Sequence, residues 1–167
     1  MEETATALTG VKYGSAAWGD YDNDGALDIL LAGTINYGST NITKIYRNNN
    51  DNTFTENERI ALTGVNSCSV AWGDYDNDGD LDLVTNDIDS QPSVFRNNCN
   101  TLFSNNYIKI KLGGPFSTGS KITIDCSGKK QFLEHHTIRG FQSSRDPVEH
   151  FGLGRDSIIT TLKIVWQ

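Results

Sequence analysis

An acidic loop of nine residues occurs twice in this chain and constrains its fold more than any other feature. The first copy, residues 20–28, reads DYDNDGALD, and the second, residues 74–82, reads DYDNDGDLD. In both copies carboxylates stand at loop positions 1, 3, 5 and 9, and a glycine stands at position 6. Four carboxylates this close repel one another in water, so the loop favours a bound hard divalent cation.

Calcium suits this loop best, because it accepts six to eight oxygen ligands in flexible geometry. The glycine permits a sharp turn where a Cβ would clash, and the backbone oxygen of position 7 is the natural further ligand. The alternative is a turn rich in Asp, Asn and Gly that needs no metal; two nearly identical copies weigh against it. The predicted ligands of the two calcium sites are Asp20, Asp22, Asp24, Ala26 and Asp28, and Asp74, Asp76, Asp78, Asp80 and Asp82.

The loop is not an EF-hand. Position 12 holds Leu31 in one copy and Thr85 in the other, where an EF-hand needs a bidentate Glu. The flanking segments, such as SAAWG before the first loop and ILLAG after it, are short apolar runs punctuated by glycine. Such runs are typical of buried strands. The sequence therefore predicts a strand–calcium loop–strand unit.

The repeat extends well beyond the loop. ALTGV at residues 7–11 recurs at 61–65, WGDY at 18–21 recurs at 72–75, and IYRNN at 45–49 matches VFRNN at 94–98. Each copy has room for about four strands, the content of one propeller blade, and the run NNNDN at 48–52 predicts a hairpin turn. Trp18 and Trp72 are expected to wedge between sheets. Arg47 and Arg96 either pair with loop carboxylates or cap a strand edge, and capping is the expected role.

The pattern changes from about residue 105, where the acidic loop does not recur. Segments 107–112 and 121–126 alternate with period two, a Ser127-Gly128 turn leads into 131–136, and residues 162–166 form a further strand. No helix is predicted. The expected fold class is all-β, with two four-stranded propeller-type blades carrying calcium loops and a C-terminal antiparallel β domain. The expected domains are 1–104, with repeats at about 5–58 and 59–104, and 105–167.

Charge and composition exclude several classes of protein. The 167 residues carry a net charge of −7, and two divalent ions would cancel more than half of it. We see no basic stripe, so nucleic acid is not an expected partner, and no run as long as a membrane helix, so membrane insertion is not expected. Of the three cysteines, Cys68 and Cys99 can pair or not, and buried thiols are expected.

Catalysis is not expected, and the chain is predicted not to be an enzyme. His135 and His136 are neighbours on a predicted strand, so they point to opposite faces and make a poor joint metal site. His150 is expected to hold a turn by a hydrogen bond. A complete carboxylate loop also leaves a calcium ion little room for substrate, so the ions are expected to be structural.

The repeated string AWGDYDNDGxLD resembles the FG-GAP/VCBS repeat, the blade of integrin-α-like β-propellers. The family fold is a propeller, often of about seven blades, whose loops bind calcium through DxDxDGxxD. Both copies match that pattern at every liganding position. The trailing Arg-Asn-Asn also resembles the end of a family blade.

The C-terminal region resembles the ASPIC/UnbV domain, which follows such repeats in secreted proteins. The resemblance rests on GSKI at 119–122, Ser143-Ser144, HFGLG at 150–154 and LKIVW at 162–166. Two blades cannot close a propeller, which needs at least four. A fragment, an oligomer and a rearranged compact form therefore remain alternatives.

The resemblance implies a calcium-binding extracellular module for adhesion or for recognition of a protein or glycan. The alternative is a non-catalytic accessory module of a larger secreted enzyme. No signal peptide is visible at the start of the chain, so we expect a piece of a protein that is secreted or displayed on the cell surface.

Overall fold

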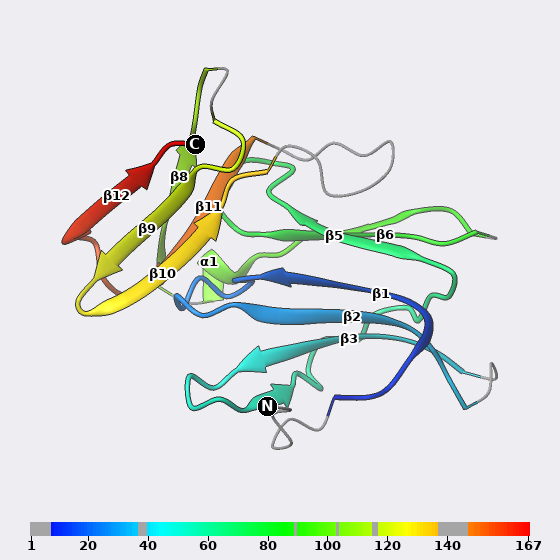
Figure 1. Ribbon diagram of the computed structural model, residues 1–167. Helices are drawn as coiled ribbons and strands as arrows, with labels where there is room; N and C mark the ends of the chain where they lie inside the picture. The colour runs from blue at the N-terminus through cyan, green and yellow to red at the C-terminus, as the bar shows by residue number, and fades with distance from the viewer. Residues whose placement is uncertain (1–7, 37–39, 89, 103, 115–116, 137–146) are drawn as a thin grey trace. The chain divides into compact units, whose positions relative to one another are not determined.

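A computed structural model describes residues 8–36, 40–88, 90–102, 104–114, 117–136 and 147–167 (Figure 1). The predicted start of the first repeat, at about residue 5, and the Ser143-Ser144 pair lie outside these residues. The described chain contains twelve strands, and every pairing between them is antiparallel. The predicted all-β fold class is therefore confirmed. The expectation of no helix is wrong for one four-residue helix, α1 (Cys99–Leu102).

The chain divides into two compact units. The first comprises Met1–Tyr21 and Ala26–Cys99, and the second comprises Asn100–Gln167 together with the short segment Asp22–Gly25. The second unit thus includes the middle of the first acidic loop, which lies far from the rest of that unit in sequence. The domain bounds expected from the sequence stay a prediction.

The first sheet is a four-stranded meander with the order β1-β2-β3-β4. Its strands are β1 (Lys12–Gly19), β2 (Asp28–Ile35), β3 (Thr40–Asn48) and β4 (Phe54–Glu56). The first acidic loop joins β1 to β2, and Gly19 pairs with Asp28 at its two ends. The asparagine-rich turn joins β3 to β4 as predicted, because Asn50 and Asn52 adopt left-handed backbone conformations with φ of 60° and 66°.

The second sheet repeats this arrangement with one strand fewer. Among the described residues it has the order β5-β6-β7, formed by β5 (Ser69–Gly73), β6 (Asp82–Asn86) and β7 (Ser93–Phe95). The described part of the second blade therefore shows three of the four expected strands. In the first blade an asparagine-rich turn follows β3, whereas after β7 the Asn97 side chain accepts a hydrogen bond from the Cys99 N–H (3.1 Å). This contact caps α1, so the chain enters a helical turn instead of a hairpin.

The two blades of the first unit pack face to face around one core. Leu30, Ala32 and Ile45 of the first blade are buried with Val70 and Leu83 of the second. The backbone of the first blade approaches the second closely at Gly19, where a Cβ would lie 2.5 Å from the Trp72 ring. Trp72 also stacks on Tyr21, with ring centroids 6.2 Å apart. Trp72 therefore wedges between sheets as predicted, and glycine is required where its ring crosses β1.

Trp18 does not share this environment. The prediction of a wedged tryptophan is wrong at this position, because the side chain is 60% exposed and contacts Phe54 of β4. Trp18 and Trp72 occupy the same position of the repeat. Only their tertiary surroundings differ: Trp72 lies between the two blades, and Trp18 lies at the surface of the first.

The second unit contains two small sheets. One has the order β10-β9-β12, and the other pairs β11 with β8. The strands are β8 (Asn106–Lys111), β9 (Lys121–Cys126), β10 (Lys129–Glu134), β11 (Val148–Gly154) and β12 (Thr161–Val165). Alternate residues of β8 and β9, including Ile110, Ile122 and Ile124, form a core with Phe151 and Leu153. The period-two pattern of the sequence therefore marked the buried faces correctly.

We predict that Gly19→Ala lowers the free energy of unfolding by about 1–3 kcal/mol, because the added methyl group overlaps the Trp72 ring. Urea denaturation would measure this difference. The matched control is Gly73→Ala, at the equivalent repeat position, where a Cβ meets nothing within 4 Å. The control should change stability by no more than about 0.5 kcal/mol. Equal losses in both variants would contradict the packing described here.

Candidate metal centre

Each acidic loop brings three carboxylates together. One oxygen from each of Asp20, Asp22 and Asp24 lies within 4.8 Å of the others, and Asp74, Asp76 and Asp78 form the same arrangement in the second loop. These are the residues at loop positions 1, 3 and 5. A set of carboxylate oxygens this close is the donor chemistry that a hard cation such as calcium requires.

The two loops share one backbone conformation. Position 4 is left-handed in both copies, with φ of 58° at Asn23 and 61° at Asn77. Position 6 is left-handed as well, with φ of 91° at Gly25 and 97° at Gly79. Asparagine and glycine are the residues that adopt this conformation at least cost. The Asn-Asp-Gly string therefore turns the chain so that positions 1, 3 and 5 face one point.

The aspartate at position 9 closes each loop. Asp28 Oδ2 accepts the Tyr21 N–H (3.3 Å), and Asp82 Oδ2 accepts the Tyr75 N–H (3.0 Å). The other oxygen reaches the end of the third strand, where Asp28 Oδ1 accepts the Asn48 N–H and Asp82 Oδ1 accepts the Asn97 N–H, both at 2.8 Å. Position 9 thus ties the start of the loop to a strand remote in sequence.

Asn48 and Asn97 complete the closure with their side chains. Asn48 Nδ2 donates to Leu27 O and Asn97 Nδ2 donates to Leu81 O, each at 3.1 Å and each to position 8 of its loop. The Arg-Asn-Asn string that contains these asparagines is repeated in the sequence, but the role of the asparagines was not predicted. The signal was present, because the asparagine recurs at the same distance after both strands, but the contact depends on how the third strand returns to the loop.

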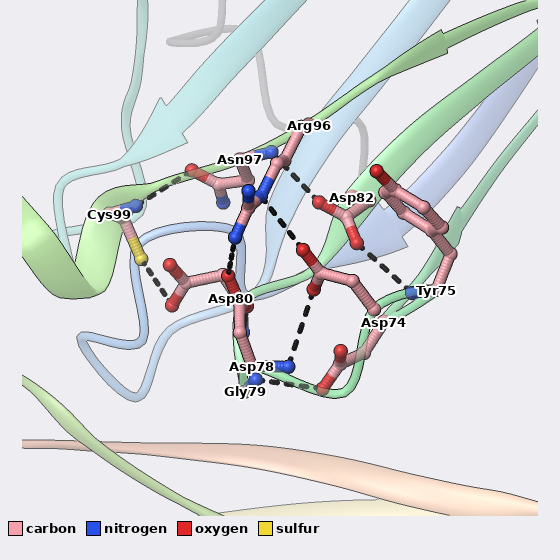
Figure 2. A network of polar contacts seen from close by, with 10 residues as sticks. Asp74, Tyr75, Asp78, Gly79, Asp80, Asp82, Arg96, Asn97 and Cys99 are labelled. Atoms are coloured by element: carbon pink, nitrogen blue, oxygen red, sulfur yellow. Dashed lines mark hydrogen bonds and ion pairs between the residues drawn. The ribbon is translucent and has the colours of Figure 1, made fainter.

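The second loop carries three further contacts, made by Arg96 and Cys99 (Figure 2). Arg96 Nε lies 2.7 Å from Asp76 Oδ2, and Arg96 Nη2 lies 3.1 Å from Asp78 Oδ2. The expected capping role is therefore wrong for Arg96, which pairs with loop carboxylates; the role of Arg47 stays a prediction. On the other side of the loop, the Cys99 thiol donates to Oδ1 of the fully buried Asp80 (3.0 Å).

Negative charge accumulates in the second loop. Burial raises the pKa of Asp82, and the charges of Asp76 and Asp78 raise it further against the opposing hydrogen bonds from Asn97 and Tyr75. Burial alone would also raise the pKa of Asp78, but its hydrogen bonds, including that from Arg96, lower it below the usual range. The site therefore favours added positive charge beside Asp82.

Comparison with known proteins agrees with this geometry. The model of the FG-GAP-like repeat matches residues 20–85, and the model named ASPIC and UnbV matches residues 113–167. The chain thus contains a region that matches the FG-GAP-like repeat, followed by a region that matches ASPIC and UnbV. Both regions are typical of extracellular β-propeller-type modules. The recognition made from the sequence is thus confirmed, with the FG-GAP-like match spanning both acidic loops.

Two curated relatives cover most of the chain. Cartilage acidic protein 1 of Mus musculus is 31% identical over 163 residues, and the Homo sapiens protein of the same name is 30% identical over the same length. Each alignment covers 88% of this chain and 24% of the relative. The chain therefore spans about a quarter of the length of these relatives. No solved structure matches the chain significantly.

The middle of the first loop is held by residues of its own compact unit. His150 Nε2, in the ASPIC and UnbV region, lies 2.7 Å from Asn23 Oδ1, and the Gly154 N–H donates to Asn23 O at 2.7 Å. Asn105 Nδ2 donates to Asp22 O (2.8 Å). The His150 ring also stacks on Tyr107, with centroids 5.3 Å apart. His150 makes a hydrogen bond as predicted, but the bond holds the first acidic loop and not a turn of its own segment, which is strand β11.

The other two histidines lie in different environments. They were predicted to lie on a strand, and this is wrong, because β10 ends at Glu134 just before them. His135 is fully buried, and its Nδ1 lies 2.9 Å from Oε1 of the buried Glu149. His136 is partly exposed and lies 3.0 Å from Glu134. Cys68, Cys99 and Cys126 are all free thiols, so the Cys68–Cys99 pair that the sequence left open is not formed. Among the described residues, no helix is long and apolar enough to cross a membrane.

We predict that Asn97→Ala destabilises the chain by about 2–3 kcal/mol, because the side chain makes three hydrogen bonds worth about 1 kcal/mol each. Two are donated to Tyr21 O (2.6 Å) and Leu81 O, and one is accepted from Cys99 N. Thermal or urea unfolding would measure the loss. Asn49→Ala is the control, because the Asn49 hydrogen bonds to Thr53 and Thr55 are exposed. A loss below about 0.5 kcal/mol at Asn97 would contradict its role.

His150→Ala is predicted to lower stability by about 1–3 kcal/mol, since it removes a part-buried hydrogen bond and a ring contact. The backbone N–H signals of residues 22–25 in an NMR spectrum should shift, because Asn23 loses its partner. The control is His136→Ala, whose contact with Glu134 is exposed. Unchanged signals in the loop after His150→Ala would contradict the contact.

Proposed function

We propose that each acidic loop binds one calcium ion and that the two ions stabilise the blades of an extracellular recognition module. The observation that carries this proposal is the equivalence of the two loops. Two segments far apart in the chain each bring three carboxylates within 4.8 Å and share the same left-handed residues. A loop shaped only by backbone turns would not need a carboxylate at each of the converging positions.

The donor set fits calcium better than other common cations. The proposed ligands are carboxylates at positions 1, 3, 5 and 9 and the position-7 backbone oxygen of Ala26 or Asp80. Oxygen-only ligation in a flexible loop favours calcium over zinc or copper, which prefer nitrogen and sulfur. A carboxylate offers about four acceptor positions, so the backbone N–H groups that Asp28 and Asp82 accept do not by themselves prevent these side chains from binding an ion.

The proposed role of the ions is structural. The aspartate at position 9 links the loop to the third strand of its blade. An ion bound to that aspartate and to positions 1, 3 and 5 would join both strands that flank the loop to the third one. Binding that occurs only in the folded state stabilises it by mass action.

The proposed biological role is recognition of a protein or glycan outside the cell. Support comes from the FG-GAP-like and ASPIC and UnbV matches and from the relatives, whose name places them in cartilage. We propose binding rather than catalysis. His135 and Glu149, the pair best suited to acid–base chemistry, are both fully buried, and His150 is engaged with Asn23.

Calcium at about one hundred times its dissociation constant should stabilise the protein by about 2.7 kcal/mol for each site. For a chain of this size, one site would raise the melting temperature by roughly 5–10 °C. Isothermal titration calorimetry should give a stoichiometry of two calcium ions per chain. Magnesium at equal concentration should be less effective, because its octahedral preference suits the loop poorly. A melting curve unaffected by calcium and by chelator would refute the proposal.

Single substitutions assign each ion to its loop. Asp20→Asn and Asp74→Asn keep the shape of the side chain and remove one ligand charge, so each should reduce the stoichiometry from two to one. Glu58→Gln is the control, because it removes one exposed charge outside the loops and should leave both sites intact. Retention of two sites in either loop variant would contradict the assignment.

The recognition role needs a separate experiment. The chain, labelled and loaded with calcium, would be applied to an array of glycans and of extracellular matrix proteins. The chain should remain bound to a glycan or protein on the array, and this binding should be lost with chelator and in the Asp20→Asn and Asp74→Asn variants. That result would support recognition by the calcium-bound fold. Calcium binding without any retention would leave the metal proposal standing and refute the recognition role.

A further inference from the structure

The interface between the two blades consists of a tryptophan seated against a glycine. Trp72 of the second blade lies against Gly19 of the first, and its ring stacks on Tyr21. Gly19 and Tyr21 belong to the repeated WGDY string, so each blade carries both halves of this contact. One half is the tryptophan, which faces one neighbouring blade. The other is the glycine–tyrosine seat, which faces the opposite neighbour.

The seat of the second blade is open. Its residues occupy the repeat positions that form the core in the first blade, yet they are exposed. Tyr75 is 62% exposed where Tyr21 is 7% exposed, and Val94 is 59% exposed where Ile45 is 5% exposed. At Gly73, the counterpart of Gly19, a Cβ would meet nothing within 4 Å.

The open seat is a groove rather than a flat surface. It has a volume of about 400 Å³. Most of its lining is apolar, and Asp82 and Arg96 contribute polar groups. The apolar side chains that line it are Trp72, Tyr75, Leu83, Val84 and Val94. Val84 is 39% exposed there, whereas Leu30, its counterpart in the first blade, is fully buried. A groove of this kind is where an aromatic anchor from a partner binds most strongly.

The matching tryptophan is exposed on the same chain. Trp18 is 60% exposed, and Phe54 of β4 holds it from one side with ring centroids 6.0 Å apart. Trp18 is the repeat counterpart of Trp72, the residue that fills the equivalent seat in the first blade. The first unit therefore presents an unused tryptophan and an unused seat at different places on its surface.

We propose that two copies of this chain associate head to tail, with Trp18 of one copy bound in the groove around Gly73 of the other. We favour a second copy as the partner because Trp18 is the repeat counterpart of Trp72. Trp72 already fills the equivalent seat, at Gly19, between the two blades. The contact is heterologous, because different surfaces meet. Each added copy leaves one tryptophan and one seat free, so association continues into longer assemblies or closes into a ring.

Sedimentation velocity across a concentration series in calcium buffer tests this association. The wild-type chain is expected to shift from monomer to dimer and larger species as concentration rises. Trp18→Ala removes the anchor, and Gly73→Leu fills the seat. Each should weaken association at least about 30-fold, the loss typical of an anchor residue at the centre of an interface. Gly73→Leu is a fair test of the seat because the position is open in the single chain.

Mixing the two variants distinguishes head-to-tail binding from other forms of dimer. The Trp18→Ala chain keeps its seat, and the Gly73→Leu chain keeps its tryptophan. Together they form one intact contact, so an equimolar mixture should yield a heterodimer and stop there. A symmetric interface formed by either surface alone would not be restored by mixing.

Thermal unfolding of each variant provides the control for folding, and both should melt close to the wild type. A wild-type chain that stays monomeric at millimolar concentration would overturn the proposal. Assembly that survives either substitution would overturn it as well, because a different surface of the chain would then be responsible. A mixture that remains monomeric while the wild type assembles would refute the head-to-tail geometry.

Discussion

Each blade depends on the carboxylate at position 9 of its acidic loop. Asp28 and Asp82 each accept one backbone N–H from the start of the loop and another from the end of the third strand. A carboxylate that accepts two such bonds is held rigidly, and charge-assisted hydrogen bonds are stronger than neutral ones. This contact fixes where the third strand ends relative to the first two. It also places the last proposed calcium ligand beside the converging carboxylates, so the shape of the blade and the chemistry of its loop arise from one side chain.

The two loops share this closure but differ in what surrounds them. In the second loop, Arg96 neutralises part of the charge on Asp76 and Asp78, and the Cys99 thiol satisfies an oxygen of the buried Asp80. The first loop has Ala26 at the position of Asp80 and has its middle residues held by His150, Gly154 and Asn105. The two copies therefore share the turn and the carboxylates, whereas the residues that contact each loop from outside differ.

Packing between blades follows from the same repeated string. Glycine after tryptophan lets the ring of one blade lie on the backbone of the next, and the tyrosine two residues later stacks on it. Because every blade carries this string, every blade has a face that needs a neighbour. Exposed apolar surface of this kind usually marks an interaction site. The acidic loops and the blade faces are thus separate features of one motif: the aspartate at position 9 closes a blade, and the exposed face determines what can pack against it.

The sequence by itself determined the all-β class, the two acidic loops, the hairpin turns and the alternating core of the second unit, because these depend on residues close together in the chain. Period-two alternation marks a buried face, and an Asn-Asp-Gly string specifies a turn, whatever surrounds them. Only the tertiary structure decided which side chains meet the loops. Asn48 and Asn97 close them, Arg96 pairs with carboxylates of the second loop, and His150 holds Asn23 in the first. The tertiary structure also decided that Trp18 is exposed while Trp72 lies between the blades. Those outcomes depend on which strand returns to which loop, and on whether a blade has a neighbour. Trp18 and Trp72 have the same local sequence, so only their surroundings could distinguish them.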